Sequence, residues 1–317
     1  MKIMVTGGAG FIAFHLIKSL VAAGHEVYGV DSFNDYYDVN LKYDRADKLK
    51  DECGVYVHYA NLCDMPALSS LFDDTPDAVI HLGAYAGVRH SLTHPDKYIQ
   101  NNIVGTQNLI NCCELFGVEN VIYASTSCVM SGNELPWKED APTFHQLNPY
   151  GYSKRTNECQ FITSKIRNTI GLRFFTVYGP WGRPDMALFT FADAIANNKP
   201  IDVFNFGDMK RDFTYVTDIV QGINIVLDRI FSVDTHINEI YNIGFGQQVN
   251  LMDFIEEIEL NLGVRVKKNF LPKHPADTKE TWSDTTKLQA LGYKPTTSIK
   301  EGVREFCNWY RWYKKEN

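Results

Sequence analysis

The first apolar run of the chain leads into Thr6-Gly7-Gly8-Ala9-Gly10-Phe11-Ile12-Ala13. Residues 3–6 have the pattern of a buried strand, and residues 11–23 have that of an amphipathic helix. Glycine at position 7 permits a tight turn, and glycine at position 10 lets the backbone approach a pyrophosphate at the positive end of the helix. Ala13 occupies the third position of this motif, which is normally Gly or Ala. The segment therefore predicts a strand, turn and helix that bind a dinucleotide.

An acidic residue follows the second expected strand, residues 26–30. Asp31 stands close to the separation at which an acid hydrogen-bonds the ribose 2′-hydroxyl of a dinucleotide. Its carboxylate would repel a 2′-phosphate, and no arginine comes directly after it. A glycine-rich turn without a ligand is the alternative, and the position of the turn between a strand and a helix, together with Asp31, disfavours it. These residues favour NAD over NADP.

Short apolar runs alternate with amphipathic segments through the first half of the chain. The expected strands are residues 3–6, 26–30, 55–59, 78–82, 121–125 and 171–175, and the expected helices are residues 11–23, 41–51, 64–73 and 95–117. This alternation predicts an α/β fold, with a Rossmann-type doubly wound parallel sheet and an NAD-binding domain over residues 1–170. Residues 171–317 are expected to form mainly a smaller C-terminal α/β substrate domain, with strands such as residues 240–243 returning to the first sheet.

Composition narrows the class of partner. The 317 residues include 31 Lys and Arg against 38 Asp and Glu, which gives a formal charge of −7. This acidic balance argues against nucleic acid or an anionic membrane as partner, although a local basic pocket for a phosphate stays possible. No run approaches the roughly 18 apolar residues that cross a bilayer, and no signal-peptide pattern opens the chain. The seven cysteines form no C-x-x-C pair and no zinc spacing. We expect a cytoplasmic protein with reduced thiols, no metal and a small-molecule ligand.

A second motif reads Asn148-Pro149-Tyr150-Gly151-Tyr152-Ser153-Lys154. It has the form of a helix start, with Asn as N-cap and Pro at the first helical position. Tyr150 and Lys154 are then one turn apart on one face. A lysine beside a tyrosine stabilises the phenolate and lowers its pKa from about 10, so the tyrosine can exchange protons near neutrality. With the hydroxyls of Ala124-Ser125-Thr126-Ser127-Cys128 at a strand end, this pair predicts proton transfer beside a nicotinamide.

These motifs resemble the extended short-chain dehydrogenase/reductases that modify nucleotide sugars, over essentially the whole chain. The resemblance rests on Thr6-Gly-Gly-Ala-Gly10, His81-Leu-Gly-Ala84, Asn102-Ile-Val-Gly105, Tyr150-x-x-x-Lys154, Arg173-Phe-Phe-Thr-Val-Tyr-Gly-Pro180 and Gly207-Asp-Met-Lys-Arg-Asp-Phe213. Within that group the chain is most similar to the UDP-glucuronate 4-epimerases. This closer likeness is carried by Asp31-Ser-Phe-Asn-Asp-Tyr-Tyr37, Pro180-Trp-Gly-Arg-Pro-Asp-Met186 and residues 207–216.

The resemblance implies a tightly bound NAD that is regenerated in each turnover, a UDP-hexose substrate and a homodimer. It implies Tyr150 as the base at the sugar 4-hydroxyl, Thr126 as a hydrogen-bond partner of the 4-oxygen, and Lys154 at the nicotinamide ribose. The cofactor-binding residues that it implies are Gly7, Gly10, Phe11, Ile12, Asp31, Asn34, Asn61, Leu62, Leu82, Ala84, Asn102, Tyr150 and Lys154. The further substrate-binding residues are Arg211 at the diphosphate, Thr176 and Arg183 at a hexuronate carboxylate, and Asp277 at the uridine ribose.

The run Thr126-Ser127-Cys128 departs from the family pattern. In the related 4,6-dehydratases the corresponding run resembles Thr-Asp-Glu, so Cys128 stands where the base that removes H5 would be, and Ser127 where an acid would protonate the departing 6-hydroxyl. A thiol with a pKa of about 8.5 could act as that base if its pKa were lowered. The family that the chain resembles includes a bifunctional 4,6-dehydratase/5-epimerase, and this resemblance implies the first expectation, a UDP-N-acetylglucosamine 4,6-dehydratase with 5-epimerase activity. The alternatives are a UDP-glucuronate 4-epimerase, in which Cys128 is an inert filler, and a non-catalytic NAD-binding scaffold.

Overall fold

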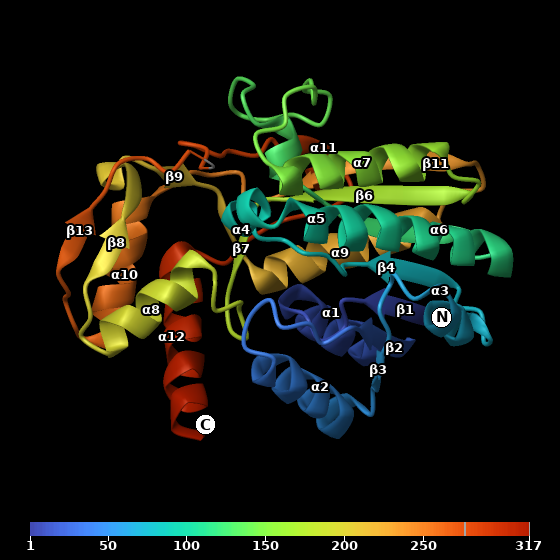
Figure 1. Ribbon diagram of the computed structural model, residues 1–317, viewed down its shortest axis with the longest axis horizontal. Coiled ribbons are helices and arrows are strands. Elements are labelled where there is room, and N and C mark those ends of the chain that lie inside the picture. The colour runs from blue at the N-terminus through green and yellow to red at the C-terminus, as the bar shows by residue number, and fades with distance from the viewer. Residues whose placement is uncertain (276, 317) are drawn as a thin grey trace.

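A seven-stranded, entirely parallel sheet forms the centre of the computed structural model, which describes residues 1–275 and 277–316. Its order is β11-β6-β5-β4-β1-β2-β3 (Figure 1), so the order reverses at β1. The strands are β1 (Lys2–Thr6), β2 (Glu26–Asp31), β3 (Val57–Tyr59), β4 (Ala78–His81), β5 (Asn120–Thr126), β6 (Asn168–Phe174) and β11 (Ile237–Ile243). This arrangement confirms the doubly wound Rossmann-type fold. In such sheets ligands bind at the carboxyl ends of the strands beside the reversal.

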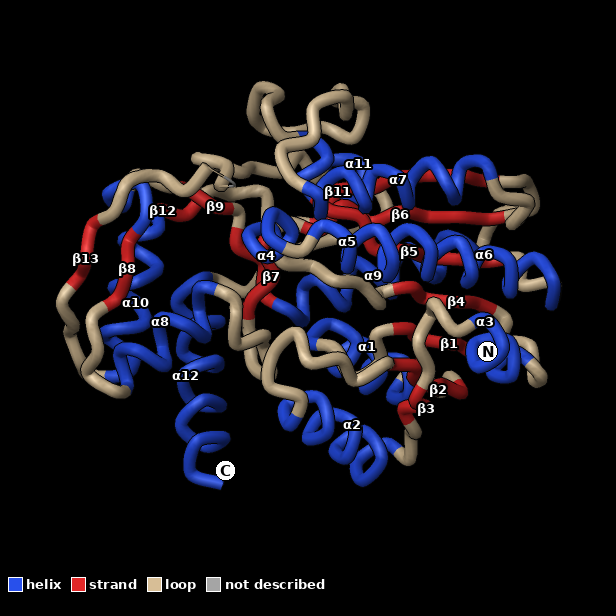
Figure 2. Tube along the Cα trace, in the orientation of Figure 1, coloured by secondary structure: helices blue, strands red, loops and turns tan. Residues whose placement is uncertain are grey.

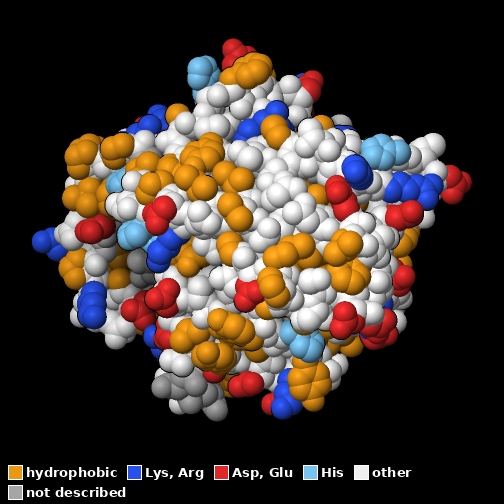
Figure 3. Space-filling model, turned by 45° about the vertical axis from the view of Figure 1, so that its right-hand side comes forward, with side chains coloured by type: hydrophobic (Ala, Val, Ile, Leu, Met, Phe, Trp, Pro, Cys, Tyr) orange, Lys and Arg blue, Asp and Glu red, His pale blue; other side chains and the backbone are white. Residues whose placement is uncertain are grey.

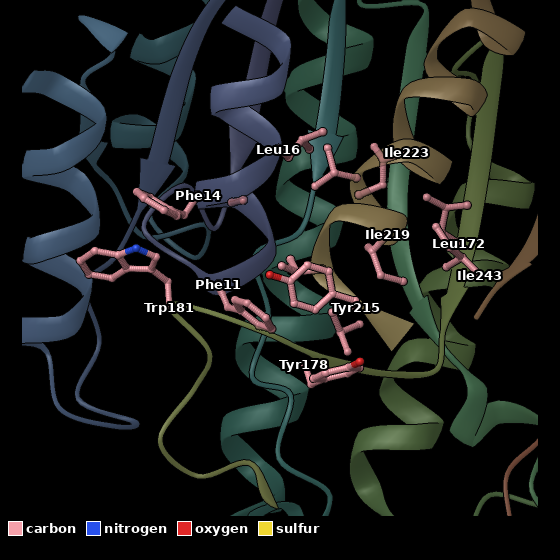
Figure 4. Close-up of a cluster of buried hydrophobic side chains, with 14 of the residues drawn as sticks. Phe11, Phe14, Leu16, Leu172, Tyr178, Trp181, Tyr215, Ile219, Ile223 and Ile243 are labelled. Atoms are coloured by element: carbon pink, nitrogen blue, oxygen red, sulfur yellow. The ribbon is translucent and has the colours of Figure 1, made fainter. Parts of the chain in front are cut away.

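Helices cover both faces of the sheet. One layer contains α1 (Phe11–Ala22), α2 (Asn40–Cys53) and α9 (Val216–Phe231); the other contains α3 (Met65–Ser69), α6 (Gly105–Phe116) and α7 (Pro149–Thr163). Alternate residues of β1 supply the two cores, because successive side chains of a strand point to opposite faces. Val5 belongs to the cluster that includes Phe14 of α1 and Ile219 of α9, both of which are labelled in Figure 4. Met4 belongs to the second cluster, with Leu109.

The long helix expected over residues 95–117 is in fact three segments. α5 (Pro95–Tyr98) passes into a π-helical turn, η2 (Ile99–Val104), before α6 begins. The wide turn sets the Asn102 side chain inward, where it is fully buried and hydrogen-bonded, and π-turns of this kind often occur near functional sites. A tighter 3₁₀ turn follows β5, where η3 (Ser127–Met130) begins directly after Thr126.

Strand β7 (Thr176–Tyr178) pairs with β10 (Phe213–Tyr215) and leads out of the sheet into a second group of elements. That group contains the parallel pair β8 (Ile201–Val203) and β13 (Lys268–Phe270), the antiparallel pair β9 (Lys210–Arg211) and β12 (Val249–Asn250), and the helices α8 (Ala187–Ala196), α10 (Leu251–Leu262) and α12 (Ile299–Glu316). Figure 2 shows these elements together at one end of the molecule. The remaining short helices are α4 (Val88–Thr93), α11 (Thr286–Gln289), η1 (Ser70–Phe72) and η4 (Phe204–Gly207).

The division expected at residue 170 falls inside β6. Both α9 and β11 come late in the chain, yet α9 packs on the sheet and β11 pairs with β6. The two halves of the sequence are therefore interleaved. In the part of the chain that the structure describes, no helix is both long and apolar enough to cross a membrane. On the face in Figure 3, basic side chains are scattered among acidic ones, in keeping with the net charge of −7.

Candidate active site

A cavity of about 1010 Å³ lies at the carboxyl ends of the central strands. The glycine-rich turn after β1 lines one end, and Pro200, Ile201 and Phe204 around β8 line the other. Tyr150 and Lys154 lie on its wall. The cavity thus connects the dinucleotide motif with the second group of elements, which is the position that the reversal of strand order predicts.

The glycine-rich turn has the geometry of a diphosphate cradle. Gly7 has a φ of +69°, and a Cβ there would lie 2.8 Å from the backbone nitrogen of Gly83. A Cβ on Gly10 would lie 2.7 Å from the Gly7 carbonyl oxygen. Gly10 is also the N-cap of α1 and offers no side-chain hydrogen bond, so the first N–H groups of the helix lack a side-chain acceptor where Phe11 and Ile12 line the cavity. These donors at the positive end of the helix dipole fit the pyrophosphate of a dinucleotide.

Asp31 connects this turn to the end of β2. Its Oδ2 accepts from the Ala9 N–H at 3.2 Å, and its Oδ1 accepts from the Phe33 N–H at 2.8 Å. A carboxylate has about four lone-pair sites, so two bonds leave capacity for a ribose hydroxyl. The other predicted residues of the cofactor end that line the cavity are Asn34, Asn61, Leu62, Leu82 and Ala84. The residues present therefore fit NAD.

The predicted helix start is confirmed at α7. The Asn148 side chain accepts from the Gly151 N–H at 2.8 Å, and Pro149 is the first helical residue. This start places Tyr150 and Lys154 on the cavity wall, one turn apart. Thr126 ends β5 at the same wall, and its hydroxyl accepts from the Cys128 N–H at 3.3 Å.

The electrostatics of the Tyr150–Lys154 pair differ from the sequence expectation. Burial raises the pKa of Tyr150 to about 12, against a hydrogen bond with Thr126 that lowers it. Burial also lowers the pKa of Lys154 to about 7, against the charge of Glu158, which raises it. The expectation that Lys154 lowers the pKa of Tyr150 toward neutrality is thus not met by the protein without its cofactor, because burial raises the pKa of Tyr150. A cationic nicotinamide would favour the phenolate.

The thiol of Cys128 lies beside this pair on the cavity wall. Burial raises the pKa of Cys128, although Thr126 and Arg211 act in the opposite direction. A thiol with a raised pKa remains protonated near neutrality and is a poor base. The role of H5 base that the sequence suggested for Cys128 is therefore not supported. Ser127 follows Thr126 in η3 and also lines the cavity, so the predicted trio does lie together.

At the sugar end, Thr176 and Arg183 both line the cavity, as predicted. Arg183 is already paired, because its Nε donates to Asp185 Oδ1 at 3.0 Å and its Nη2 donates to Asp185 Oδ2. Tyr36 donates to the same Asp185 Oδ2 at 3.0 Å, and its ring lies 5.5 Å from the Arg183 guanidinium carbon. Burial alone would raise the pKa of Asp185, but Arg183 lowers it. The guanidinium is therefore held in a fixed orientation.

Two predicted residues, Asn102 and Arg211, are not among the described residues that line the cavity. The amide of Asn102 is fully used by the Tyr85 backbone and Ser153 Oγ, each at 2.9 Å. The Asn102 side chain therefore supports the loop after β4. Arg211 is not in that lining either, and its Nη1 donates to the carbonyl oxygens of Lys210 and Lys279 at 2.9 and 2.8 Å. It remains close enough to lower the pKa of Cys128.

Sequence reasoning also missed some residues at this site. Asp277 lines the cavity as predicted, but it is held by Arg89, whose Nη2 donates to Asp277 Oδ2 at 2.7 Å. The Arg89 guanidinium carbon also lies 4.1 Å from the centre of the Phe204 ring. Tyr36 stood inside a quoted motif without an assigned role. Since these partners are far apart in sequence, local spacing offered no signal for their pairing.

Among the described side chains no group of three or more could hold a metal ion.

Comparison with known proteins agrees with this geometry. Residues 3–244 match the NAD dependent epimerase/dehydratase family. Protein CapI of Staphylococcus aureus is 43% identical over 335 aligned positions, which cover 99% of this chain and 100% of that protein. UDP-glucuronate 4-epimerase of Thermodesulfobacterium geofontis is 39% identical, with 96% of this chain and 95% of the relative covered. The crystal structure of UDP-glucuronic acid 4-epimerase from Bacillus cereus in complex with UDP-glucuronic acid and NAD has a TM-score of 0.91 and 33% identity, over 99% of this chain and 100% of that one. This chain therefore belongs to the NAD dependent epimerase/dehydratase family, and NAD is its cofactor.

Proposed function

We propose that this protein is a UDP-glucuronate 4-epimerase. The observation that carries the proposal is the shared cavity, which is lined by Tyr150 and Thr126, by the diphosphate cradle and by Arg183, whose guanidinium Asp185 orients. The two UDP-glucuronate 4-epimerases described above match over nearly the whole chain, which supports the same substrate class.

Bound NAD would supply the acceptor and donor of a hydride at the sugar C4. The protein contributes the proton transfer. Tyr150, as phenolate, takes the proton of the 4-hydroxyl while Thr126 hydrogen-bonds the 4-oxygen, and Lys154 holds the nicotinamide ribose. After the 4-keto sugar turns its other face to the cofactor, the Tyr150 phenol returns the proton to the 4-oxygen. No group needs to ionise over C5, in keeping with a Cys128 thiol whose pKa is raised.

Arg183 is the group that would select a charged sugar. Its fork onto Asp185 uses Nε and Nη2, and Nη1 takes no part in that fork. A guanidinium carries five N–H donors, so it can accept a second carboxylate as partner. Thr176 lines the same end and adds a hydroxyl donor. A hexuronate carboxylate fits this donor set better than a neutral hydroxymethyl group does.

This proposal replaces the UDP-N-acetylglucosamine 4,6-dehydratase that the sequence first suggested. That expectation depended on Cys128 as a base, and burial raises the pKa of its thiol. The similar proteins also favour the epimerase, since two of them are UDP-glucuronate 4-epimerases. A silent scaffold is disfavoured because Thr126, Tyr150 and Lys154 are intact and meet at one wall of the cavity.

The deciding experiment incubates purified protein in D2O with UDP-glucuronate and, separately, with UDP-N-acetylglucosamine, and follows both sugars by NMR. The proposal predicts UDP-galacturonate with hydrogen retained at C5. A 6-methyl signal with deuterium at C5 in the second sample would instead establish the dehydratase. Tyr150→Phe serves as the control, because it removes the proton acceptor and leaves the cavity otherwise unchanged.

We propose further that the protein is a homodimer, assembled through α6 and α7. Exposed apolar side chains lie on this part of the surface, at Ile99, Val104, Leu115 and Ile162. Burial of such side chains against a second copy would stabilise the pair. Light scattering on the purified protein should give the mass of a dimer, and Ile162→Glu should shift it to that of a monomer. A monomeric wild-type protein would contradict this assembly.

A further inference from the structure

One fully buried arginine connects the backbone before Arg183 with the backbone of the dinucleotide cradle. Arg45 of α2 has no exposed surface. Its Nε and Nη2 donate to the Trp181 carbonyl oxygen at 3.1 and 2.6 Å, and its Nη1 donates to the Ala9 carbonyl oxygen at 3.0 Å. Nη2 also lies 3.3 Å from the carbonyl oxygen of Gly182, and Nη1 donates to the Tyr37 hydroxyl at 2.7 Å. These acceptors are all neutral, so carbonyl and hydroxyl dipoles stabilise the buried charge, a task more often performed by a carboxylate.

The loop that Arg45 holds has a backbone that needs support. Trp181 has a φ of +61°, a left-handed conformation that costs a residue other than glycine roughly 1–2 kcal/mol. The preceding carbonyl oxygen, of Pro180, lies 2.8 Å from His15 Nε2 of α1. The Trp181 ring packs on Phe14, with ring centres 5.1 Å apart, as Figure 4 shows. Three consecutive carbonyls, 180 to 182, are therefore anchored on α1 and α2.

Arg183 follows these anchored carbonyls directly, and its side chain lines the sugar end of the cavity. At the other end, Ala9 precedes Gly10, the N-cap of α1 in the diphosphate cradle. One guanidinium thus fixes the distance between the backbone that carries Arg183 and the backbone that holds the cofactor. Lysine could not replace it, because an ammonium is a point donor and lacks the planar fork that reaches several acceptors at once.

We propose that Arg45 is a positioning residue for substrate recognition: it holds Arg183 in register with the dinucleotide cradle and thereby sets the affinity for the charged end of a UDP-hexuronate. The inference rests on the proposed function, since Arg183 is taken as the partner of the substrate carboxylate. The inference predicts that a variant of Arg45 binds UDP-glucuronate less tightly but binds UDP about as well, because Arg45 itself touches neither the uridine end of the cavity nor the reacting atoms.

The test uses the NAD-containing enzyme with Arg45→Lys, which keeps the charge and removes the fork. Calorimetry measures the binding of UDP-glucuronate and of UDP, and kinetics give KM and kcat. Affinity for UDP-glucuronate should fall at least about tenfold and KM should rise in parallel, since misplacement by about 1 Å is costly. Affinity for UDP, measured for both proteins with NAD bound, should change less than about twofold.

A matched control is Lys48→Met on the same helix. Lys48 lies over the Trp181 ring at 6.0 Å from its centre, yet it lies outside the cavity lining, so its loss should leave both affinities unchanged. Should Arg45→Lys fail to fold, Tyr37→Phe removes one of the contacts of Arg45 and should show the same selective loss at about two- to threefold. Equal losses for UDP and UDP-glucuronate, or no loss at all, would overturn the inference. Wild-type enzyme that binds but does not epimerise UDP-glucuronate would contradict the proposed function instead, and the affinity comparison would still decide the role of Arg45.

Discussion

Glu158 and Arg173 form a buried ion pair in which Arg173 Nε lies 2.9 Å from Glu158 Oε1. Ser125 of β5 donates to the same carboxylate oxygen at 2.6 Å, and Arg155 Nη1 donates to Oε2 at 3.0 Å. Glu158 lies one helical turn beyond Lys154 on α7, and its charge raises the pKa of that lysine. The pair therefore holds the end of β5 in place, and its carboxylate favours the protonated form of Lys154 on α7.

Glu158→Gln should lower the free energy of unfolding by about 3 kcal/mol, because it leaves Arg173 buried without a counter-charge. Urea denaturation measures this change. The control is Glu119→Gln, which breaks an exposed pair with Arg167 and should cost less than about 1 kcal/mol. Equal losses from the two substitutions would show that burial of the Glu158 pair is not what matters.

Tyr150→Phe should lower kcat for C4 inversion by about 10²- to 10⁴-fold, because it removes the group that takes the proton of the 4-hydroxyl. NAD content should stay at the wild-type level, since the glycine cradle is untouched. NMR of the sugar product measures the rate, and Tyr152→Phe, outside the cavity lining, is the matched control. A Tyr150→Phe enzyme with near wild-type kcat would assign the proton transfer to another residue.

His15 should make the protein sensitive to acid. Burial lowers the pKa of His15 to about 4 from its ordinary value of 6.5, so the unfolded chain binds the proton more readily than the folded protein. Neutral His15 therefore contributes up to about 3 kcal/mol to the free energy of unfolding. This contribution is present above pH 6.5 and is lost as the pH falls toward 4. The His15→Gln variant should have a lower free energy of unfolding than wild type at pH 7.5. Urea titrations at a series of pH values should show that this free energy falls less steeply with pH in the variant. Parallel curves for the variant and the wild type would refute the assignment. The pKa of His81, also lowered by burial, contributes in the same direction in both proteins.

Cys128→Ser should leave the rate of C4 inversion within about threefold of wild type, because inversion at C4 requires a base only at the 4-hydroxyl, and Tyr150 is that base. The same NMR assay in D2O measures both inversion and deuterium at C5. Loss of C5 exchange in the variant, where the wild-type enzyme shows it, would restore Cys128 as a base.

Several features could be predicted from the sequence because local spacing determines them. The turn at residues 6–13 joins adjacent elements, and a helix repeat of about 3.6 residues places Tyr150 and Lys154 on one face. The alternation of strands and helices indicated the parallel sheet in the same way. The break of residues 95–117 into three helical segments was not predictable, because a π-turn is stabilised by buried contacts such as those of Asn102.

Only the tertiary structure decided which residues far apart in the chain contact each other and which titratable side chains are buried. Arg45 and Trp181 are hydrogen-bonded but 136 residues apart in the sequence, and Tyr36 and Asp185 are 149 residues apart, so no local sequence pattern predicts either pair. The raised pKa of Cys128 depends on burial, which the residue type does not specify. Local backbone geometry thus determined where the cofactor binds, whereas long-range packing and desolvation decided which side chains can ionise and which can meet the sugar.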